Sequence, residues 1–279
     1  MGPLDRPVNR RQSSRFSQWS IAVELDLVWI ITLLLTGLGA GTIDAIAGGG
    51  GLITLPVLLA SGLSPIQALA TNKLQGSFGT FAATLYFVRK RQVDLRAMRG
   101  MILSTFIGSA AGTLLVQHID NSILAAIMPA LLILIAIYFA FSPRIGDLDR
   151  ERRISTALFT GAIASGIGFY DGFFGPGTGT FFTLAFVTLA GFGLARATAH
   201  TKVLNFTSNI ASLLFFLFSG HIVWLAGLAL AVGQLIGGQL GARLVVTRGT
   251  RLVRPLIVTV TLLMSAKLLL DHLGITLID

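Results

Sequence analysis

Long apolar runs, separated by short polar or charged loops, recur along the whole chain. A helix needs about 20 consecutive apolar residues to cross the hydrocarbon core of a bilayer, and several of these runs approach that length. The runs are Leu27 to Ala47, Ile66 to Val88, Met101 to Val116, Ile123 to Phe141, Leu158 to Gly168, Ala197 to Phe218, Ile222 to Leu235 and Leu256 to Leu270. No soluble domain of useful size fits between them, so the pattern predicts an all-α polytopic membrane protein.

Two further apolar segments are too short to cross a bilayer, and each follows a glycine-rich stretch. Leu52 to Ala60 comes after Gly48 to Gly51, and Phe181 to Ala190 comes after a stretch that contains Gly175 and Gly177. At 1.5 Å per residue the first segment would be roughly 14 Å long, which is about half of a hydrocarbon core. We expect each to be a half-helix or a re-entrant segment, which gives about 8–10 transmembrane or re-entrant helices in all.

The two halves of the chain match each other at a nearly constant spacing. Lys73 and Lys202 lie 129 residues apart and Asp44 and Asp171 lie 127 apart, so a gap of two residues relates the two spacings. The spacing of 129 also pairs Ala68 with Ala197, Ala70 with Ala199, Gly108 with Gly237 and Gly112 with Gly241. One duplication therefore covers nearly the whole chain, as in many transporters.

The duplication divides the chain into four parts. Residues 1–20 form a basic N-terminal arm with four arginines, which we expect to be mobile. Residues 21–141 form the first transmembrane repeat and residues 156–279 form the second. Residues 142–155, which are rich in Arg, Asp and Glu, link the repeats, and the arginines of this linker favour a cytoplasmic location.

The charged residues are concentrated in loops. The chain has 21 Lys and Arg against 12 Asp and Glu, a net charge of +9, but the basic residues flank apolar runs, which favours a lipid bilayer over a nucleic acid as partner. The loop from Arg89 to Arg99 is basic, whereas its counterpart, Ser219 to His221, has no Lys or Arg. The next loop reverses this bias, because His118 to Asn121 has none and the region from Arg243 to Arg254 has four arginines.

Equivalent loops with opposite charge bias indicate opposite orientations in the membrane, which is typical of an inverted-topology repeat. Inversion needs an odd number of crossings in each half, about five segments with the short pieces counted, and it places the N-terminus outside. If the arginine-bearing arm is cytoplasmic instead, the first short piece is re-entrant and the crossings number about eight. We favour inversion, and the second arrangement stays open.

One carboxylate stands beside each glycine-rich stretch. Asp44 and Asp171 would lie at membrane depth, where an ionisable side chain almost always faces a partner or a cavity. They are candidates for gating or for carrying protons, and the alternative is that each caps a glycine turn by accepting backbone N–H groups. The glycines permit close backbone approach and expose the first N–H groups of the following half-helix, which attract an anion. Tight helix packing through small residues is the alternative for the glycines.

A lysine lies inside each of the long helices that follow the short segments. Lys73 and Lys202 are roughly 8–10 Å into their helices by rise per residue, too deep for surface residues unless they snorkel. Lys202, Asn205 and Asn209 are spaced to share one helix face, as are Lys73, Gly76 and Thr80. A cation and amide donors on one face suit a small oxyanion, so a role toward a substrate or a counter-ion is predicted.

His200 stands where the first half has Thr71, and it could relay protons near neutral pH or be a structural histidine. Gln75 and Gln234 are weaker polar candidates. The predicted substrate-binding residues are Gly48, Gly49, Gly50, Gly51, Thr71, Asn72, Lys73, Gly175, Gly177, Thr178, Gly179, His200, Thr201, Lys202, Asn205 and Asn209.

Motifs of common enzymes are missing from the sequence. It has no zinc-binding HExxH helix, no GxSxG nucleophile elbow and no phosphate-binding P-loop, and it has no cysteine for thiolate chemistry, disulfides or metal ligation. We therefore expect no enzymatic activity, no cofactor and no metal site.

Four stretches of the sequence resemble the TauE/SafE sulfite exporter family, and within it the YfcA-like branch of membrane transporters. They are Ile43 to Pro56, Ala70 to Gln75, Gly168 to Pro176 and Ala197 to Lys202. The similarity extends from about Leu33 to Asp271, so only the N-terminal arm lies well outside it.

The resemblance implies export or uptake of sulfite, small sulfonates or related organosulfur anions across the bacterial cytoplasmic membrane. It also implies a site at Asp44, Gly48 to Gly51, Thr71, Asn72, Lys73, Asp171, Gly175, Gly177, His200, Thr201 and Lys202. The substrate of the YfcA-like branch is not fixed by the resemblance.

The resulting hypothesis is a secondary transporter, most simply an exporter, of a small sulfur oxyanion. The proton gradient or the membrane potential would drive it, since no nucleotide-hydrolysing element is present. The lysines and the glycine N–H groups would bind the anion, and the two aspartates would gate the site or carry protons. Two alternatives of another class are a non-transporting membrane scaffold and an intramembrane enzyme. The sequence leaves the oligomeric state open, a homodimer included.

Overall fold

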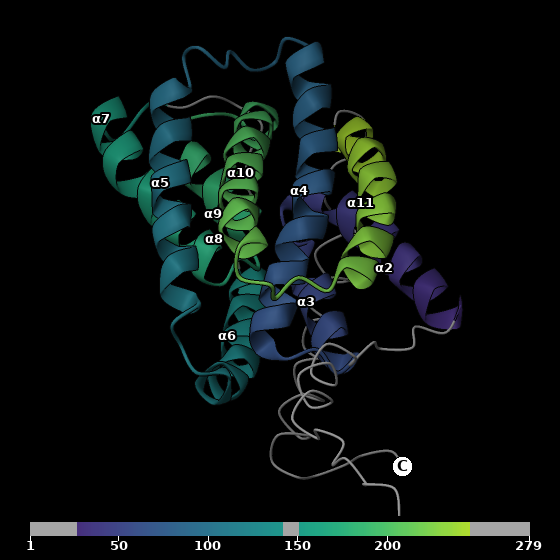
Figure 1. Ribbon diagram of the computed structural model, residues 1–279. Coiled ribbons are helices and arrows are strands. Elements are labelled where there is room, and N and C mark those ends of the chain that lie inside the picture. Colours follow the sequence, from purple (N-terminus) through teal and green to yellow (C-terminus); the bar gives the residue numbers. More distant parts are fainter. Residues whose placement is uncertain (1–26, 142–150, 246–279) are drawn as a thin grey trace, which may run out of the picture.

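The computed structural model describes residues 27–141 and 151–245, which form helices joined by short loops, with no strand in either range. The all-α prediction is therefore confirmed for the described part of the chain. The first half contributes α2 (Leu27–Ala47), α3 (Gly51–Ala60), α4 (Pro65–Arg89), α5 (Arg99–Val116) and α6 (Asn121–Phe141) (Figure 1). The second half contributes α7 (Thr156–Leu158), the π-helical turn η1 (Phe159–Ala164), α8 (Ser165–Phe173), α9 (Thr178–Thr188), α10 (Leu194–Leu217) and α11 (Trp224–Val245).

The helices agree with the apolar runs of the sequence. Within the described residues, α2, α5, α6 and α11 are long and apolar enough to span a bilayer, as judged by length and composition. The two short segments are the helices α3 and α9, with 10 and 11 residues. The last predicted run, Leu256 to Leu270, lies outside the described residues, as do the N-terminal arm and most of the linker.

Helix α4 begins where its sequence predicts. Ser64 is the N-cap and Pro65 is the first helical residue, whose missing N–H group costs nothing at that position. The N–H group of Ser64 donates to the side chain of Gln67 over 3.0 Å, which is one half of a capping box. The following turns of α4 contain several polar residues, which contribute polar groups to the protein interior.

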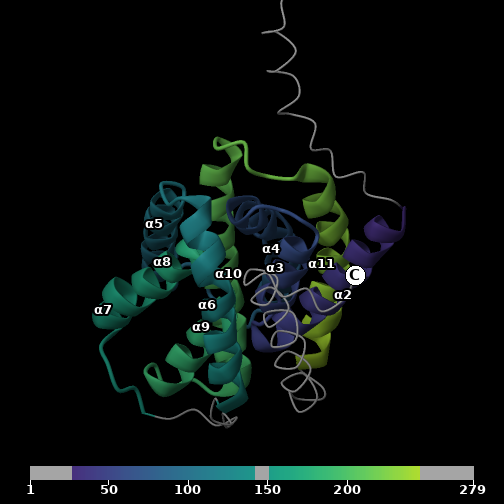
Figure 2. The same cartoon turned by 90° about the horizontal axis from the view of Figure 1, so that it is seen from below.

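The helices form three layers, and each outer layer combines the two halves of the chain. Helix α2 of the first half packs against α11 of the second, and α5 of the first half packs against α8 of the second. Helices α4 and α10 lie in contact between these two layers (Figure 2). The halves are therefore intertwined, and neither has a core of its own.

Glycines allow the close contacts within the outer layers. A Cβ atom on Gly108 of α5 would overlap the carbonyl oxygen of Ser165 in α8, and one on Gly237 of α11 would overlap that of Leu38 in α2. Gly108 and Gly237 are 129 residues apart, and Leu38 and Ser165 are 127 apart, which are the two spacings of the duplication. The same contact therefore occurs at both interfaces between the halves, with the roles of the halves exchanged.

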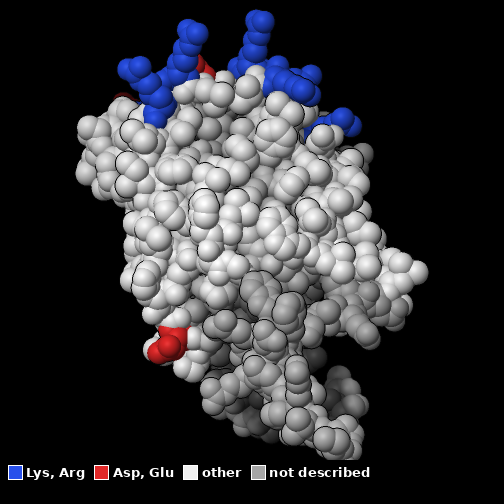
Figure 3. Space-filling model, viewed as in Figure 1, with Lys and Arg blue, Asp and Glu red and all other residues white. Residues whose placement is uncertain are grey.

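Equivalent helices run in opposite directions. The α4–α5 connection lies at one end of the molecule and the α10–α11 connection at the other (Figure 1). Basic side chains gather at the end with the α4–α5 connection on the face that Figure 3 shows. This arrangement is the one that an inverted repeat requires, and the repeat relation itself stays a prediction.

Substituting a glycine at a layer contact tests the tight packing. A Cβ atom on Gly172 of α8 would overlap the carbonyl oxygen of Ser109 in α5, so Gly172→Ala is expected to lower the free energy of unfolding in detergent by about 1–3 kcal/mol. Gly166→Ala in the same helix is the control, because a Cβ atom there meets nothing within 4 Å. That change should be neutral or stabilise by up to about 1 kcal/mol. Equal thermal stability of the two variants would contradict the close contact.

The absence of cysteine from the sequence allows the directions of the helices to be tested with single-cysteine variants. Gln92→Cys marks the α4–α5 loop and Phe218→Cys marks the start of the α10–α11 loop, and both positions are exposed. We expect a membrane-impermeant maleimide to label them from opposite sides of the membrane in cells and in inverted vesicles. Labelling of both from one side would exclude an inverted arrangement.

Candidate functional site

Two helices that are interrupted by glycine form the frame of the site. Helix α2 ends at Ala47 and α3 begins at Gly51, while α8 ends at Phe173 and α9 begins at Thr178. Gly48 has a φ angle of 78°, and Gly175 and Gly177 have φ angles of 103° and 85°. Side chains with a Cβ atom rarely adopt these left-handed values, so glycine is needed for the sharp change of direction.

The two interruptions are in direct contact. A Cβ atom on Gly48 would lie 2.5 Å from the backbone nitrogen of Thr180 and would overlap Gly179. The hydroxyl of Thr180 donates to the carbonyl oxygen of Ala47, which joins the start of α9 to the end of α2. Two helix starts from different halves therefore meet in the protein interior, and several of their first N–H groups, such as those of Ile53 and Thr178, donate to carbonyl oxygens of the interruptions.

Crossed ion pairs connect the long central helices to the interrupted ones. Lys73 of α4 lies 2.8 Å from Oδ1 of Asp171 in α8, and Lys202 of α10 lies 3.2 Å from Oδ2 of Asp44 in α2. Each ammonium also donates to the backbone carbonyl of its aspartate, in the last turn of a helix, where the helix dipole favours a cation. Each lysine thus pairs with the carboxylate of the other half.

These ion pairs are removed from solvent. Lys73 and Asp171 are 1% and 2% exposed, and Lys202 and Asp44 are 1% and 13% exposed. A buried lysine is rare in proteins unless a partner compensates its charge. The pairing therefore explains how two lysines are tolerated in the middle of the molecule.

A network of amides and hydroxyls extends from the pairs. The hydroxyl of Thr54 donates to Oδ1 of Asn72 over 2.7 Å, and Nε2 of Gln75 donates to the same oxygen over 2.7 Å. In the second half, Asn209 donates to Oδ1 of Asn205 over 3.2 Å. Most of the polar groups in the interior are thus held by side chains of helices α3, α4 and α10.

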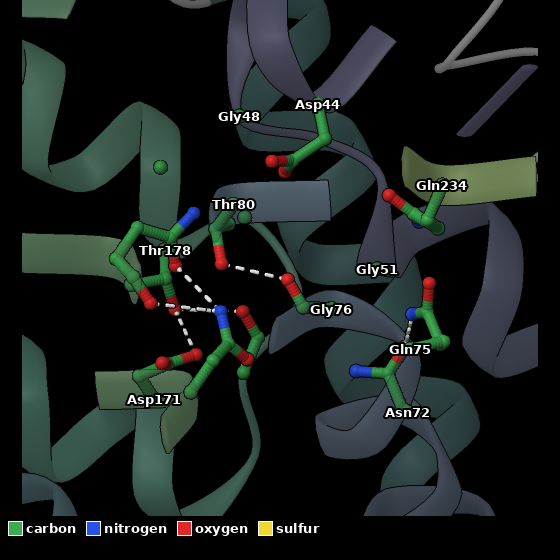
Figure 4. A pocket seen from close by; sticks show the side chains of 15 residues that line it. Asp44, Gly48, Gly51, Asn72, Gln75, Gly76, Thr80, Asp171, Thr178 and Gln234 are labelled. Carbon is green, nitrogen blue, oxygen red and sulfur yellow. Dashed lines mark hydrogen bonds between the residues drawn. The ribbon is translucent and has the colours of Figure 1, made fainter. Parts of the chain in front are cut away.

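A small polar cavity of about 30 Å³ lies among these groups. A buried water needs roughly 10–15 Å³, so the cavity has room for about two waters in this conformation. Asp44 and Asp171 reach the site from different helices, with Asn72 and Gln75 at another edge (Figure 4). Its lining residues are Asp44, Gly48, Gly51, Asn72, Gln75, Gly76, Thr80, Asp171, Gly175, Gly177, Thr178, Gly179, Asn205, Asn209 and Gln234.

Most of the predicted site residues lie at this cavity. Both aspartates, Asn72, Thr178, Asn205, Asn209 and five of the predicted glycines line it. Gly49 and Gly50 lie within the first interruption, and the N–H group of Gly50 donates to Oδ1 of Asp44 over 3.3 Å. Lys73 lies directly behind the wall, since its Nζ would be 2.8 Å from a Cβ atom on Gly175. Lys202 lies behind Asp44 in the same way.

Three predicted residues lie elsewhere, in structural contacts. Thr71 accepts from the N–H group of Val223 over 3.0 Å and so joins α4 to the start of α11. The ring of His200 packs against Phe186 and Phe192, and its Nδ1 donates to the carbonyl oxygen of Arg196 over 2.8 Å. Thr201 contacts the hydroxyl of Thr183 over 3.1 Å.

Four lining residues are outside the predicted set. They are Gln75, Gly76, Thr80 and Gln234. Their signals were present in the sequence: Gly76 and Thr80 follow Lys73 at helical spacing, and Gln234 is a polar residue inside an apolar run. Gln75 belongs with Asn72 in the network described above.

The fold and the site define a class of protein: a multi-pass α-helical membrane protein with a small polar site between two interrupted helices. The family model for the sulfite exporter TauE/SafE matches residues 33–268. The chain therefore belongs to the TauE/SafE family, and it is a membrane transporter of that type.

Several curated proteins are similar to this chain over most of its length. "Probable membrane transporter protein YfcA" of Escherichia coli K12 is 51% identical over 235 residues, which cover 84% of this chain and 87% of that protein. A "Probable membrane transporter protein" of Haemophilus influenzae is 49% identical and covers 90% of this chain and 97% of its own length. YunE of Bacillus subtilis, also named a probable membrane transporter protein, is 27% identical over 76% of this chain and 87% of its own. No solved structure matches the chain.

A double-mutant cycle tests the Lys73–Asp171 pair. Lys73→Ala leaves a buried carboxylate without its partner, so we expect it to lower the free energy of unfolding in detergent by about 3–5 kcal/mol. Removing both charges, by Lys73→Ala with Asp171→Ala, should destabilise clearly less than the sum of the single changes. Lys90→Ala, at an exposed lysine, is the control and should change stability by no more than about 0.5 kcal/mol. Additive effects of the two single changes would contradict the pairing.

Proposed function

We propose that the protein is a secondary transporter that moves a small sulfur oxyanion, such as sulfite or a small sulfonate, across the bacterial cytoplasmic membrane. Membership of the TauE/SafE family supports the sulfur chemistry, and export is the direction that the family's name suggests. The proton gradient or the membrane potential would supply the energy.

The observation that carries this proposal is the meeting of two helix interruptions from different halves at one small polar cavity. The starts of α3 and α9 bring backbone N–H groups and the positive ends of two helix dipoles to the site. Asn72, Asn205 and Asn209 add amide groups that can donate to an oxyanion. Interrupted helices of this kind form the substrate sites of several transporter folds.

The lysines have a different role in this proposal from the one that their sequence positions suggest. Each ammonium is held by an aspartate and by a backbone carbonyl, so neither is free to bind the anion directly. The lysines lie outside the cavity wall and neutralise the charges of the two carboxylates that line it. The anion would be held by amides, hydroxyls and backbone N–H groups.

Alternating access would follow from rocking of the two intertwined halves. The cavity of about 30 Å³ is too small for a polyatomic anion, so the site would have to widen before a substrate binds. We propose that the halves form an inverted repeat and that rocking opens the site first to one side and then to the other. The basic end of the molecule would face the cytoplasm under the positive-inside rule.

Flux measurements in proteoliposomes test the function. We expect the purified protein to catalyse efflux of sulfite or methanesulfonate, and we expect Asn205→Leu to slow it at least about tenfold, since it removes a hydrogen bond worth about 1.5–3 kcal/mol to a charged solute. Gln92→Leu, at an exposed amide in the α4–α5 loop, is the matched control and should leave the rate unchanged.

Two outcomes would reject the proposal. If no sulfur anion moves through the folded wild-type protein, a scaffold without transport becomes the better account. If Asn205→Leu and the control transport equally fast, the cavity is not the binding site.

A further inference from the structure

The two equivalent aspartates differ in how their oxygens are used. Oδ1 of Asp44 accepts from the N–H group of Gly50 and Oδ2 accepts from Lys202, so both oxygens have a partner. In Asp171, Oδ1 accepts from both Lys73 and the hydroxyl of Thr178, at 2.8 and 2.9 Å. Oδ2 of Asp171 is buried and has no hydrogen-bond partner among the described residues. A buried oxygen without a partner is costly, so such a group calls for an explanation.

The charges around Asp171 sum to zero. Lys73 faces it from α4, Tyr170 precedes it in α8, and Asp44 and Lys202 lie at the other side of the cavity. Helix α9 and η1 have no ionisable side chain, and the only one in α5 is Arg99, which is exposed at the start of that helix. Two carboxylates and two ammonium groups therefore balance at the site.

This balance restricts what can enter the site. A monoanion alone would leave a net negative charge in a largely buried site whose walls include two carboxylates, and an uncompensated buried charge is strongly unfavourable. A proton that binds together with the anion restores neutrality. Protonation of Asp171 also weakens its electrostatic attraction to Lys73. The positive charge of Lys73 is then left to attract the incoming anion, from which only Gly175 separates it.

Of the two carboxylates, Asp171 can take the proton without losing a hydrogen bond. Protonation of Asp44 would disturb either its contact with Gly50 or its pair with Lys202. A sodium ion is a poorer candidate than a proton at Oδ2, because it needs several oxygen ligands and would lie close to the ammonium of Lys73.

We propose that Asp171 carries one proton with each monoanion, while Asp44 serves only to hold the first helix interruption. The proposal rests on the proposed function, which it refines by assigning the coupling ion and its residue. Oδ2 gains a proton from water on the loading side and returns it to water on the other side, so the carboxylate is regenerated. The anion then moves in the same direction as the proton, so the proton gradient would drive uptake, and export would take its energy from an outward gradient of the anion and not from the proton gradient.

Proteoliposomes that contain a pH-sensitive dye test this assignment with sulfite and methanesulfonate as probes. In the wild type, entry of methanesulfonate, which stays a monoanion, should acidify the lumen in a ratio of about one proton per anion. Asp171→Asn, which resembles the protonated carboxyl, should still exchange anion for anion. The flux that a pH gradient drives should fall at least about tenfold in this variant. Asp44→Asn is the matched control and should keep the ratio of the wild type, whatever its rate.

Several results would overturn the assignment. They are wild-type anion entry without protons, proton entry through Asp171→Asn, loss of coupling in Asp44→Asn alone, and stimulation by a sodium gradient in place of a pH gradient. Each of these leaves transport itself intact, so the proposed function would survive.

Infrared difference spectra of the purified protein give a readout that does not depend on transport. Acidification should produce a band of a protonated carboxyl in the wild type and in Asp44→Asn, and this band should be absent from Asp171→Asn. If none of the probes is transported but the band behaves in this way, the proposed function fails and the proton site stands. If the band is the same in all three proteins, Asp171 is not the proton site.

Discussion

The crossed pairing of Lys73 with Asp171 and of Lys202 with Asp44 is the interaction on which the rest of the structure depends. Four ionisable groups lie in the interior of a membrane protein, where an isolated charge would cost several kcal/mol. Each pair joins a continuous helix of one half to an interrupted helix of the other. The pairs therefore fix the position of both interruptions and make the stability of each half dependent on the other.

The interior of this protein is more polar than the surface that faces lipid. Helices α4 and α10 carry buried lysines, amides and hydroxyls in the centre, while large apolar side chains such as Leu35, Leu103 and Leu134 are exposed on the outer helices. Apolar burial cannot drive helix association in lipid, so close backbone contact and interhelical hydrogen bonds take its place. The glycines of α5 and α11 supply the close contact, and the hydroxyl network of Ser109, Thr113 and Ser212 supplies hydrogen bonds between α5 and α10.

The sequence was sufficient to predict the helices and their glycine interruptions, because both depend on local signals. Ser64 and Pro65 mark the start of α4, and the run of glycines from Gly48 marks the end of α2. The partners of the lysines could not be predicted, because Lys73 and Asp171 are 98 residues apart and only the packing of the two halves brings them together. For the same reason the lysines looked free to bind an anion.

Equivalent positions in the two halves set a second limit on what could be predicted from the sequence. Thr71 and His200 occupy the same place in the duplication, but Thr71 accepts a backbone hydrogen bond and His200 packs between two phenylalanine rings. A duplicated position shows where the backbone lies and does not show which neighbours have diverged around it. The differing partners of Asp44 and Asp171 are of this kind, since both oxygens of Asp44 have a partner and Oδ2 of Asp171 has none among the described residues.

The pairs also limit how the halves can move. Separation of the interruptions by several ångströms would break both pairs, and removing one partner of a buried pair costs about 3–5 kcal/mol. A rotation whose axis passes near the pairs avoids this cost: turning by about 10° moves a helix end about 18 Å away by roughly 3 Å and leaves groups near the axis almost in place. Helices α4 and α10, with 25 and 24 residues, extend far enough in both directions for such a rotation to open either end. The ion pairs that neutralise the site are therefore also the natural pivot for exposing it.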